Sequence, residues 1–178
     1  MDRLIALLRQ LSVRHQRVIL ASGQESDFYV DARQTTLHPE GSVLIARAIL
    51  ARLRPDVMGV GGPTTGADPI AGAVAALSFL EGRPVQGFMV RKEAKGYGMK
   101  NAVEGRGPLP PGSPVCLVED TVTTGGSLLR AIRQAEAEGL VVVQVIVVVD
   151  REEGAAEALA AAGYTMEALT RKSELSAR

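Results

Sequence analysis

Apolar and polar positions along the chain follow two alternating patterns. Short, almost continuous apolar runs predict strands that are buried on both faces, at residues 57–60, 85–90, 115–118 and 141–149, with a last strand at 164–169. Between these runs the apolar residues recur every three or four positions, which predicts helices over residues 69–80, 127–138 and 154–162. Alternation of this kind is typical of an α/β fold with a central, mostly parallel sheet flanked by helices.

The N-terminal part of the chain has its own pattern. An amphipathic helix is predicted around Leu4 and Leu11, and two short strands at residues 18–20 and 28–30 are expected to pair in antiparallel fashion. We expect residues 1–35 to form a small hood over a core of residues 36–178, so that the chain is a single domain.

A further helix is predicted to begin at Pro39, with an acidic residue in its first turn. His38, just before it, is expected to be a surface or capping residue, with a chemical role as the alternative. Its expected apolar face consists of Val43, Ala46, Leu50 and Leu53.

Composition narrows the class of protein. The chain has 178 residues, with 20 Lys and Arg against 20 Asp and Glu, so it lacks the positive charge of a nucleic-acid-binding domain. Its single cysteine, Cys116, lies inside a predicted buried strand and indicates a core residue. No signal peptide is evident, and the apolar run at 140–149 is too short to span a bilayer. A cytoplasmic protein is expected.

The chemistry is concentrated after the strand at 115–118. Glu119 and Asp120 come directly after the apolar run, where open α/β sheets bind their ligands. A loop of Thr and Gly then leads into a helix, and such a helix N-terminus presents free N–H groups to a phosphate. The acids would repel a phosphate, but they suit sugar hydroxyls and the positive charge of a ribose that is losing its C1 substituent. The pattern predicts a site for a 5-phosphorylated ribose.

Residues 115–127 resemble the phosphoribosyl pyrophosphate (PRPP) signature of the type I phosphoribosyltransferases. The resemblance implies that Glu119 and Asp120 hold the ribose, with Asp120 catalytic. The 5-phosphate would be held by Thr121, Val122, Thr123, Thr124, Gly125, Gly126 and Ser127. An ordinary strand–helix turn with solvated acids is the alternative. Other nucleotide motifs are absent, since no G-x-x-x-x-G-K-[ST] occurs and Thr64 occupies the third glycine position of a G-x-G-x-x-G.

Two more loops are expected at the same edge of the sheet. The loop at residues 61–66, including Thr65 and Gly66, resembles the family's pyrophosphate-binding loop, although some members carry a lysine at the position of Gly66. A purely structural glycine turn is the alternative.

Three of the four lysines fall between residues 92 and 100, within a long stretch that has no apolar periodicity. This stretch resembles the mobile catalytic loop of orotate phosphoribosyltransferases, which implies that Arg91, Lys92 and Lys95 neutralise the departing pyrophosphate. Tyr97 stands where many members have histidine. A solvated surface loop is the alternative.

Two segments are similar to the parts of orotate phosphoribosyltransferases that contact the base. They are the Ser-Gly-x-x-Ser-x-x-Tyr-x-Asp pattern that ends at Asp31, and the Asp-Arg-x-x-Gly pattern that begins at Asp150. The resemblance implies orotate contacts from Tyr29, Val30, Thr123 and Arg151. The other interpretation of Arg151 is a surface ion pair with a neighbouring acid.

The resemblance implies transfer of a phosphoribosyl group from PRPP to orotate, a step of pyrimidine biosynthesis that gives orotidine 5′-phosphate and pyrophosphate. It also implies Mg²⁺ carried by PRPP near Asp120 rather than by protein ligands, and a homodimer that shares its lid loops. A purine phosphoribosyltransferase and a non-catalytic PRPP sensor are the alternatives, with no role expected for nucleic acid or membranes.

Overall fold

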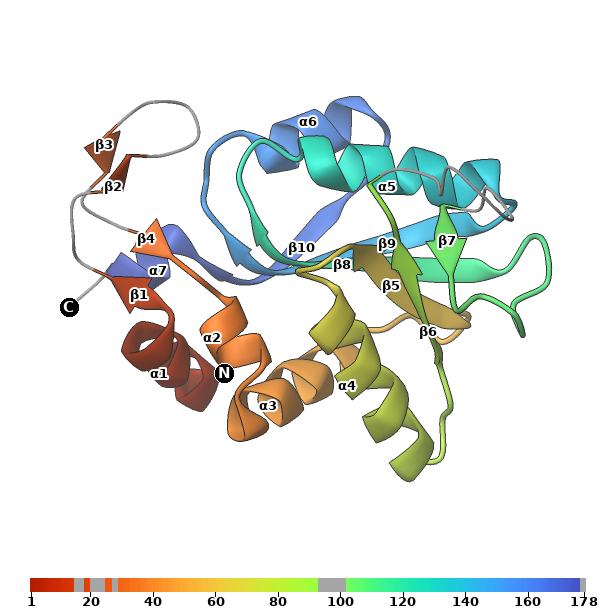
Figure 1. Ribbon diagram of the computed structural model, residues 1–178, viewed down its shortest axis with the longest axis horizontal. Helices are drawn as coiled ribbons and strands as arrows, with labels where there is room; N and C mark the ends of the chain where they lie inside the picture. The colour runs from red at the N-terminus through yellow and green to blue at the C-terminus, as the bar shows by residue number, and fades with distance from the viewer. Residues whose placement is uncertain (15–17, 20–24, 27–28, 93–101, 177–178) are drawn as a thin grey trace.

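A six-stranded sheet forms the centre of the molecule, with helices on both faces (Figure 1). The computed structural model describes residues 1–14, 18–19, 25–26, 29–92 and 102–176. The strand order is β10-β9-β8-β5-β6-β7, and every pair is parallel except β6 with β7. The α/β fold with a mostly parallel sheet is therefore confirmed.

The sheet strands are β5 (Gly59–Pro63), β6 (Gln86–Val90), β7 (Val103–Glu104), β8 (Pro114–Val122), β9 (Val141–Asp150) and β10 (Met166–Arg171). The helices are α1 (Asp2–Leu11), α2 (Arg33–Thr36), α3 (Pro39–Leu50), α4 (Asp68–Leu80), α5 (Gly126–Ala137), α6 (Ala155–Ala161) and α7 (Lys172–Ser176). None of the helices in these described ranges is long and apolar enough to cross a membrane.

The order of the strands reverses between β5 and β8. From β5 the chain proceeds to β6 on one side, and it then returns to β8 on the other side. Connections that leave two such neighbouring strands diverge to opposite faces of the sheet, which opens a crevice at their carboxyl ends. The loops after β5 and β8 contain the phosphate and ribose motifs of the sequence, so the topology brings these motifs together.

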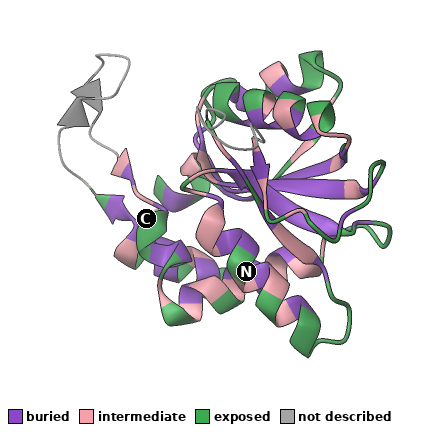
Figure 2. Cartoon of the chain, turned by 45° about the vertical axis from the view of Figure 1, so that its right-hand side comes forward, coloured by how far each residue is buried: buried purple, intermediate pink, exposed green. Residues whose placement is uncertain are grey.

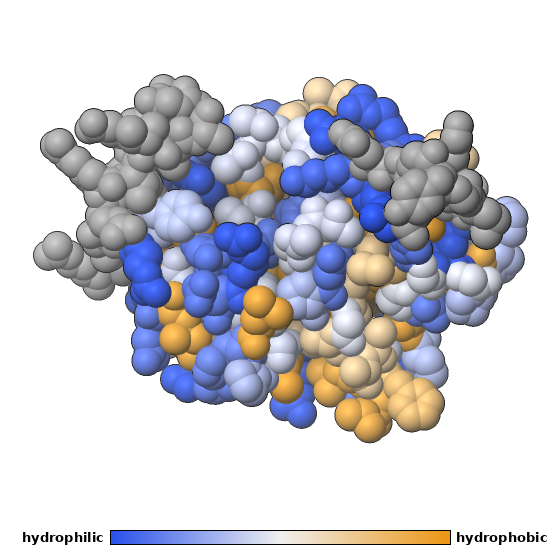
Figure 3. Space-filling view, viewed as in Figure 1, coloured by the Kyte–Doolittle hydropathy of each residue, from blue (hydrophilic) through white to orange (hydrophobic). Residues whose placement is uncertain are grey.

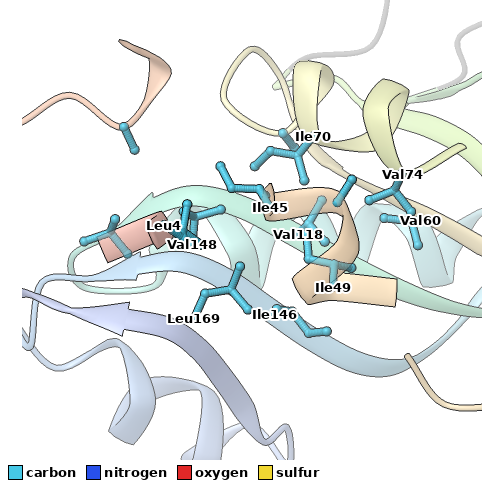
Figure 4. Close-up of a cluster of buried hydrophobic side chains, with 14 of the residues drawn as sticks. Leu4, Ile45, Ile49, Val60, Ile70, Val74, Val118, Ile146, Val148 and Leu169 are labelled. Atoms are coloured by element: carbon cyan, nitrogen blue, oxygen red, sulfur yellow. The ribbon is translucent and has the colours of Figure 1, made fainter. Parts of the chain in front are cut away.

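Two apolar layers bury the sheet. On one face α1, α3 and α4 pack against the strands, through side chains such as Ile45, Ile49 and Val74 (Figure 4). On the other face α5 and α6 pack through Leu128, Ile132 and Leu159. Burial is continuous along β5 and nearly so along β8 and β9, and it is lost on the outer faces of the helices (Figure 2).

Cys116 lies within this core, in β8, and is fully buried. Its burial among apolar neighbours raises the pKa of the thiol far above its ordinary value. The expected role of Cys116 as a core residue is confirmed.

Two glycines that the sequence analysis placed in a loop belong to a strand. The strand predicted at 57–60 runs instead from Gly59 to Pro63. A side chain at Gly61 would overlap Phe88, and one at Gly62 would overlap the carbonyl oxygen of Val118. Glycine is thus required here for close packing of β5 against β6 and β8, and not for the approach of an anion.

The N-terminal segment pairs differently from the prediction. β1 (Val13–Arg14) pairs with β4 (Tyr29–Val30), and β2 (Val18–Ile19) pairs with β3 (Glu25–Ser26), so the strands expected at 18–20 and 28–30 are not partners. Strands of two residues carry too little periodicity to be located from the sequence. The short elements α2, α7 and β7 were not predicted for the same reason.

The start of α3 agrees with the prediction, and its buried face agrees in part. The side chain of His38 accepts a hydrogen bond from the N–H of Gly41, as expected for an N-cap. Ala46 and Leu53 are buried as predicted, whereas Val43 is 42% exposed. The helix also buries Ile45 and Ile49, which the predicted face did not include, so tertiary packing turns the buried face away from Val43.

Candidate functional site

A cleft of about 330 Å³ opens at the carboxyl ends of β5 and β8. It brings together the loop after β5, the end of β6, the acids of β8 and the beginning of α5. From the sequence-predicted set its lining includes Tyr29, Val30, Thr65, Gly66, Arg91, Lys92, Glu119, Asp120, Thr121, Val122, Thr123, Thr124, Gly125, Gly126 and Ser127. Segments far apart in the sequence thus converge on one site.

Glu119 and Asp120 lie on the part of β8 that extends beyond β5. The ladder between β5 and β8 ends at the Gly61–Leu117 pair, whereas β9 continues to pair with β8 as far as Val122. The two acids were expected to follow the strand, and they belong to it. Because β8 has lost its partner on the β5 side at this point, its carboxylates face an open crevice and not a neighbouring strand.

Gly66 forms the floor beneath these acids. A Cβ at this position would overlap the carboxylate oxygens of Asp120 and Glu119. The absence of a side chain therefore lets the backbone of the β5 loop lie directly against the acid pair. A lysine could not occupy this position unless both carboxylates moved.

The acid pair is electrostatically unusual. Glu119 is only 8% exposed, and its burial, followed by the charge of Asp120, raises its pKa to about 9. Burial also raises the pKa of Asp120. The N–H of Thr121 and the positive charge of Arg33 favour the ionised form and so oppose this rise. Burial and the charge of the neighbouring acid thus favour the protonated form of Glu119.

The helix α5 begins at the opposite side of the cleft with unpaired N–H groups. Gly125 precedes it in the left-handed region (φ 80°), a conformation that favours glycine, and no described side chain caps the helix. Gly126 and Ser127 are exposed in the cleft. Free N–H groups and the positive end of the helix dipole make this turn suitable for a phosphate monoester.

Comparison of this chain with known proteins identifies its family. The model of the phosphoribosyl transferase domain matches residues 39–163. An orotate phosphoribosyltransferase of Sorangium cellulosum is 46% identical over 170 residues, covering 94% of this chain and 88% of that protein. The chain belongs to the orotate phosphoribosyltransferase family. A second member, from Nostoc sp., is 44% identical and covers 94% of this chain and 81% of its own length.

Solved structures of orotate phosphoribosyltransferases have the same fold. The Mycobacterium tuberculosis enzyme in complex with Fe(III) dicitrate matches with a TM-score of 0.85 and 43% identity, over 98% of both chains. The same enzyme in complex with PRPP matches with a TM-score of 0.80 and 39% identity, also over 98% of both. A Leishmania donovani adenine phosphoribosyltransferase, at 20% identity and a TM-score of 0.69, shares the fold alone.

Arg91 and Lys92 line the cleft at the end of β6. The Arg91 guanidinium donates to Glu104 Oε1 at 2.9 Å, and its backbone N–H donates to the carbonyl of Ala102. Lys95 and Tyr97 were also predicted from the sequence to belong to a catalytic loop. Both lie outside the described residues.

Arg33 is a cleft residue that the sequence analysis missed. Its Nε donates to Asp31 Oδ1 at 2.8 Å, and both residues line the cleft next to Tyr29 and Val30. Its charge also reaches Asp120. The sequence feature that could have identified Arg33 was its position two residues after Asp31. It lies at the end of the segment that is similar to orotate phosphoribosyltransferases.

Arg151 does not line the described cleft. It is 8% exposed, and its backbone N–H donates to the carbonyl of Val122, so it lies one strand behind the cleft wall. Nη2 is 2.8 Å from Glu153 Oε1, yet neither Nε nor Nη2 makes an aligned hydrogen bond to any described residue. A buried guanidinium with unused donors has unmet hydrogen-bonding capacity.

Within the described ranges no group of three or more His, Cys, Asp or Glu side chains is arranged to hold a metal ion. The carboxylates of Glu119 and Asp120 are the oxygen donors that face the open cleft together, and oxygen donors suit Mg²⁺.

The raised pKa of Glu119 predicts a pH-dependent loss of stability. Between its ordinary value of 4.5 and about 9, the folded protein holds a proton on Glu119 that the unfolded chain releases. The free energy of unfolding therefore falls as pH rises through this window, by up to about 1.4 kcal/mol per pH unit from this group. Glu119→Gln, which cannot titrate, should lose less stability than the wild type between pH 6 and pH 8 in urea unfolding.

A Glu157→Gln variant, which removes an exposed carboxylate from α6, is the control and should keep the wild-type slope. Equal pH slopes for the wild type and Glu119→Gln would show that Glu119 is ionised in the folded protein at neutral pH.

Proposed function

We propose that this protein transfers the 5-phosphoribosyl group of PRPP to N1 of orotate, giving orotidine 5′-phosphate and pyrophosphate. The observation that supports this most directly is the shared cleft of the Glu119–Asp120 pair and the uncapped start of α5. A carboxylate pair and an anion cradle in one crevice suit a molecule that has ribose hydroxyls at one end and a phosphate at the other. A cytoplasmic enzyme is proposed, in line with the free buried thiol of Cys116.

Binding begins at the two anionic ends of PRPP. The N–H groups at the start of α5, with the hydroxyls of Thr123, Thr124 and Ser127, hold the 5-phosphate. The loop around Thr65 and Gly66 receives the pyrophosphate, where it offers backbone groups rather than a cation. Thr121 contributes a buried hydroxyl that no other described residue engages.

The acid pair acts on the ribose between these ends. As the bond from C1 to pyrophosphate lengthens, positive charge develops on the ring. The carboxylate of Asp120 stabilises that charge from a position where water is partly excluded. Mg²⁺ fits this site as part of the PRPP complex, next to Asp120 and Glu119, and when bound it would neutralise pyrophosphate oxygens.

Arg91 and Lys92 supply the cations that favour departure of pyrophosphate, and Lys95 completes the set. Arg91 is held by Glu104, so its guanidinium is oriented before the substrate arrives. No side chain of the protein acts as a nucleophile in this scheme, because attack comes from N1 of the base. The rate enhancement comes from positioning and from charge stabilisation.

The hood of residues 1–35 covers the base in this proposal. Tyr29 and Val30 line the cleft through β4, which offers backbone groups to the polar edge of a pyrimidine. The planar carboxylate of orotate matches a guanidinium, and Arg151 is the proposed partner. Because Arg151 lies one strand behind the cleft wall, beside Glu153, this contact requires the guanidinium to turn from Glu153 towards the cleft. A purine lacks this carboxylate.

We also propose a homodimer in which the lid of one subunit, including Lys95 and Tyr97, closes over the PRPP site of the other. Phe79 and Leu80, at the end of α4, are 72% and 78% exposed. Figure 3 shows apolar surface in the region of α4. Exposed apolar area of this kind is common where proteins associate.

The reaction is tested by incubating the protein with PRPP, Mg²⁺ and one nucleobase at a time while pyrophosphate is measured. Orotate should give pyrophosphate, and adenine, guanine and hypoxanthine should not. PRPP binding by the wild type without turnover of any base would favour a sensor instead.

Asp120→Asn should lower kcat about ten- to a thousandfold with little loss of PRPP affinity. The reason is that a unit charge about 4 Å from the developing cation contributes roughly 4 kcal/mol at an effective dielectric near 20.

The proposed base contact predicts that Arg151→Ala raises the KM for orotate about tenfold or more and leaves PRPP affinity intact. Glu153→Gln removes the ion-pair partner without touching the guanidinium, and it should leave the KM for orotate within about twofold of the wild-type value. A loss of PRPP affinity in Arg151→Ala with an unchanged KM for orotate would contradict this assignment.

The shared lid predicts recovery of activity when two inactive proteins exchange subunits. In a mixed dimer of Asp120→Asn and Lys95→Ala chains, one site has both residues intact and the other has neither. Random exchange makes half of the dimers mixed, so roughly a quarter of wild-type activity should return. If activity stays at the parental level after exchange has been verified by mass spectrometry, the lid serves its own subunit.

A further inference from the structure

Glu138 occupies a position that helix energetics do not favour. It ends α5, where the negative end of the helix dipole lies, and an acidic residue there is unfavourable unless other groups compensate. Its side chain is only 16% exposed. A carboxylate that is held at such a place requires specific partners.

The partners of Glu138 belong to residues 102–106, the segment that contains β7 (Val103–Glu104). Its Oε1 accepts hydrogen bonds from the backbone N–H groups of Ala102 and of Val103, the latter at 2.9 Å. Its Oε2 lies 3.3 Å from Nε of Arg106. Three groups of one short segment thus converge on a single carboxylate at the end of α5.

The segment needs this support. β7 has only two residues and lies at the edge of the sheet, where it pairs with β6 alone. A two-stranded contact of this length is marginal without further packing. Figure 1 shows β7 beside the C-terminal end of α5, where Glu138 satisfies the N–H groups that would otherwise face outward.

Arg91 depends on the same segment. Its N–H donates to the carbonyl of Ala102, and its guanidinium donates to Glu104. Residues 102 and 104 therefore fix both the backbone and the side chain of this cleft cation. The contacts run from Glu138 to Ala102 and Val103, and from there to Arg91.

The helix that carries Glu138 also carries the phosphate cradle. α5 begins at Gly126 in the cleft and spans 12 residues, or about 18 Å. The phosphate cradle at its first turn and Glu138 at its C-cap therefore lie at the two ends of one rigid helix.

We propose that Glu138 is a positioning residue that fixes Arg91 relative to the phosphate cradle, so that the pyrophosphate end of PRPP meets a preoriented guanidinium. The inference rests on the proposed role of Arg91. It assigns to Glu138 no contact with substrate.

The test compares Glu138→Ala with Glu136→Ala, its matched control on the same helix. The carboxylate of Glu136 accepts from the Tyr164 hydroxyl, away from β7. Glu138→Ala should weaken binding of PRPP and of pyrophosphate about tenfold, while affinity for orotidine 5′-phosphate, which has no pyrophosphate, stays within about twofold. Glu138→Gln keeps an acceptor oxygen and should recover most of the loss. Glu136→Ala should change neither affinity.

A double-mutant cycle distinguishes action through Arg91 from general damage. In an Arg91→Ala background, Glu138→Ala should cause no further loss of PRPP affinity, because the residue it positions is gone. Additive losses, or equal weakening of PRPP and orotidine 5′-phosphate, would overturn the inference.

A separate readout keeps the two proposals distinguishable. If Arg91→Ala alone leaves PRPP affinity unchanged, the role of Arg91 under Proposed function fails. Hydrogen exchange of the Ala102 and Val103 amides then still reports on Glu138. Faster exchange in Glu138→Ala, but not in Glu136→Ala, supports its hold on this segment, and unchanged exchange refutes it.

Discussion

The cleft depends on one electrostatic constraint, which is that two adjacent carboxylates lie in a confined space where they cannot both be charged at low cost. Glu119 is buried against the backbone of Gly66, and Asp120 stands beside it at the mouth of the cleft. The free protein meets the constraint by keeping a proton on Glu119. A substrate that brings hydroxyl donors, a metal ion and developing positive charge would relieve it. The same arrangement that strains the empty site therefore favours the occupied one.

The fold makes this constraint possible through the unequal lengths of neighbouring strands. β8 is paired on both sides as far as Leu117 and on one side only beyond it. Core packing thus holds the strand firmly up to the residues before the acids. The acids then project from a rigid element and not from a loop, which keeps their position fixed when substrates bind.

The sequence predicted the site best where its chemistry is local. The role of residues 119–127 could be predicted from the local sequence alone, because a buried strand, two acids and a helix start follow one another without interruption. The role of the glycines after the first strand of the sheet was harder to predict, since glycine serves both close packing and anion binding. Only the structure shows that Gly61 and Gly62 pack against neighbouring strands, whereas Gly66 lies under the acids. Glu138 could not be assigned, because its partners Ala102 and Val103 are set by tertiary contacts that leave no periodic signal. Arg33 pairs locally with Asp31, but its place in the cleft depends on the tertiary fold.

The isolation of the one sulfhydryl has a practical consequence. Thiols react as thiolates, and Cys116 is fully buried in β8 with its ionisation suppressed. Thiol-directed alkylating reagents will therefore leave Cys116 of the folded protein unmodified, and the native cysteine need not be removed before labelling. A single cysteine introduced at an exposed position, such as that of Glu157 on α6, would be the one reactive thiol of the folded protein. A fluorophore or spin label attached there would give a signal without background from Cys116.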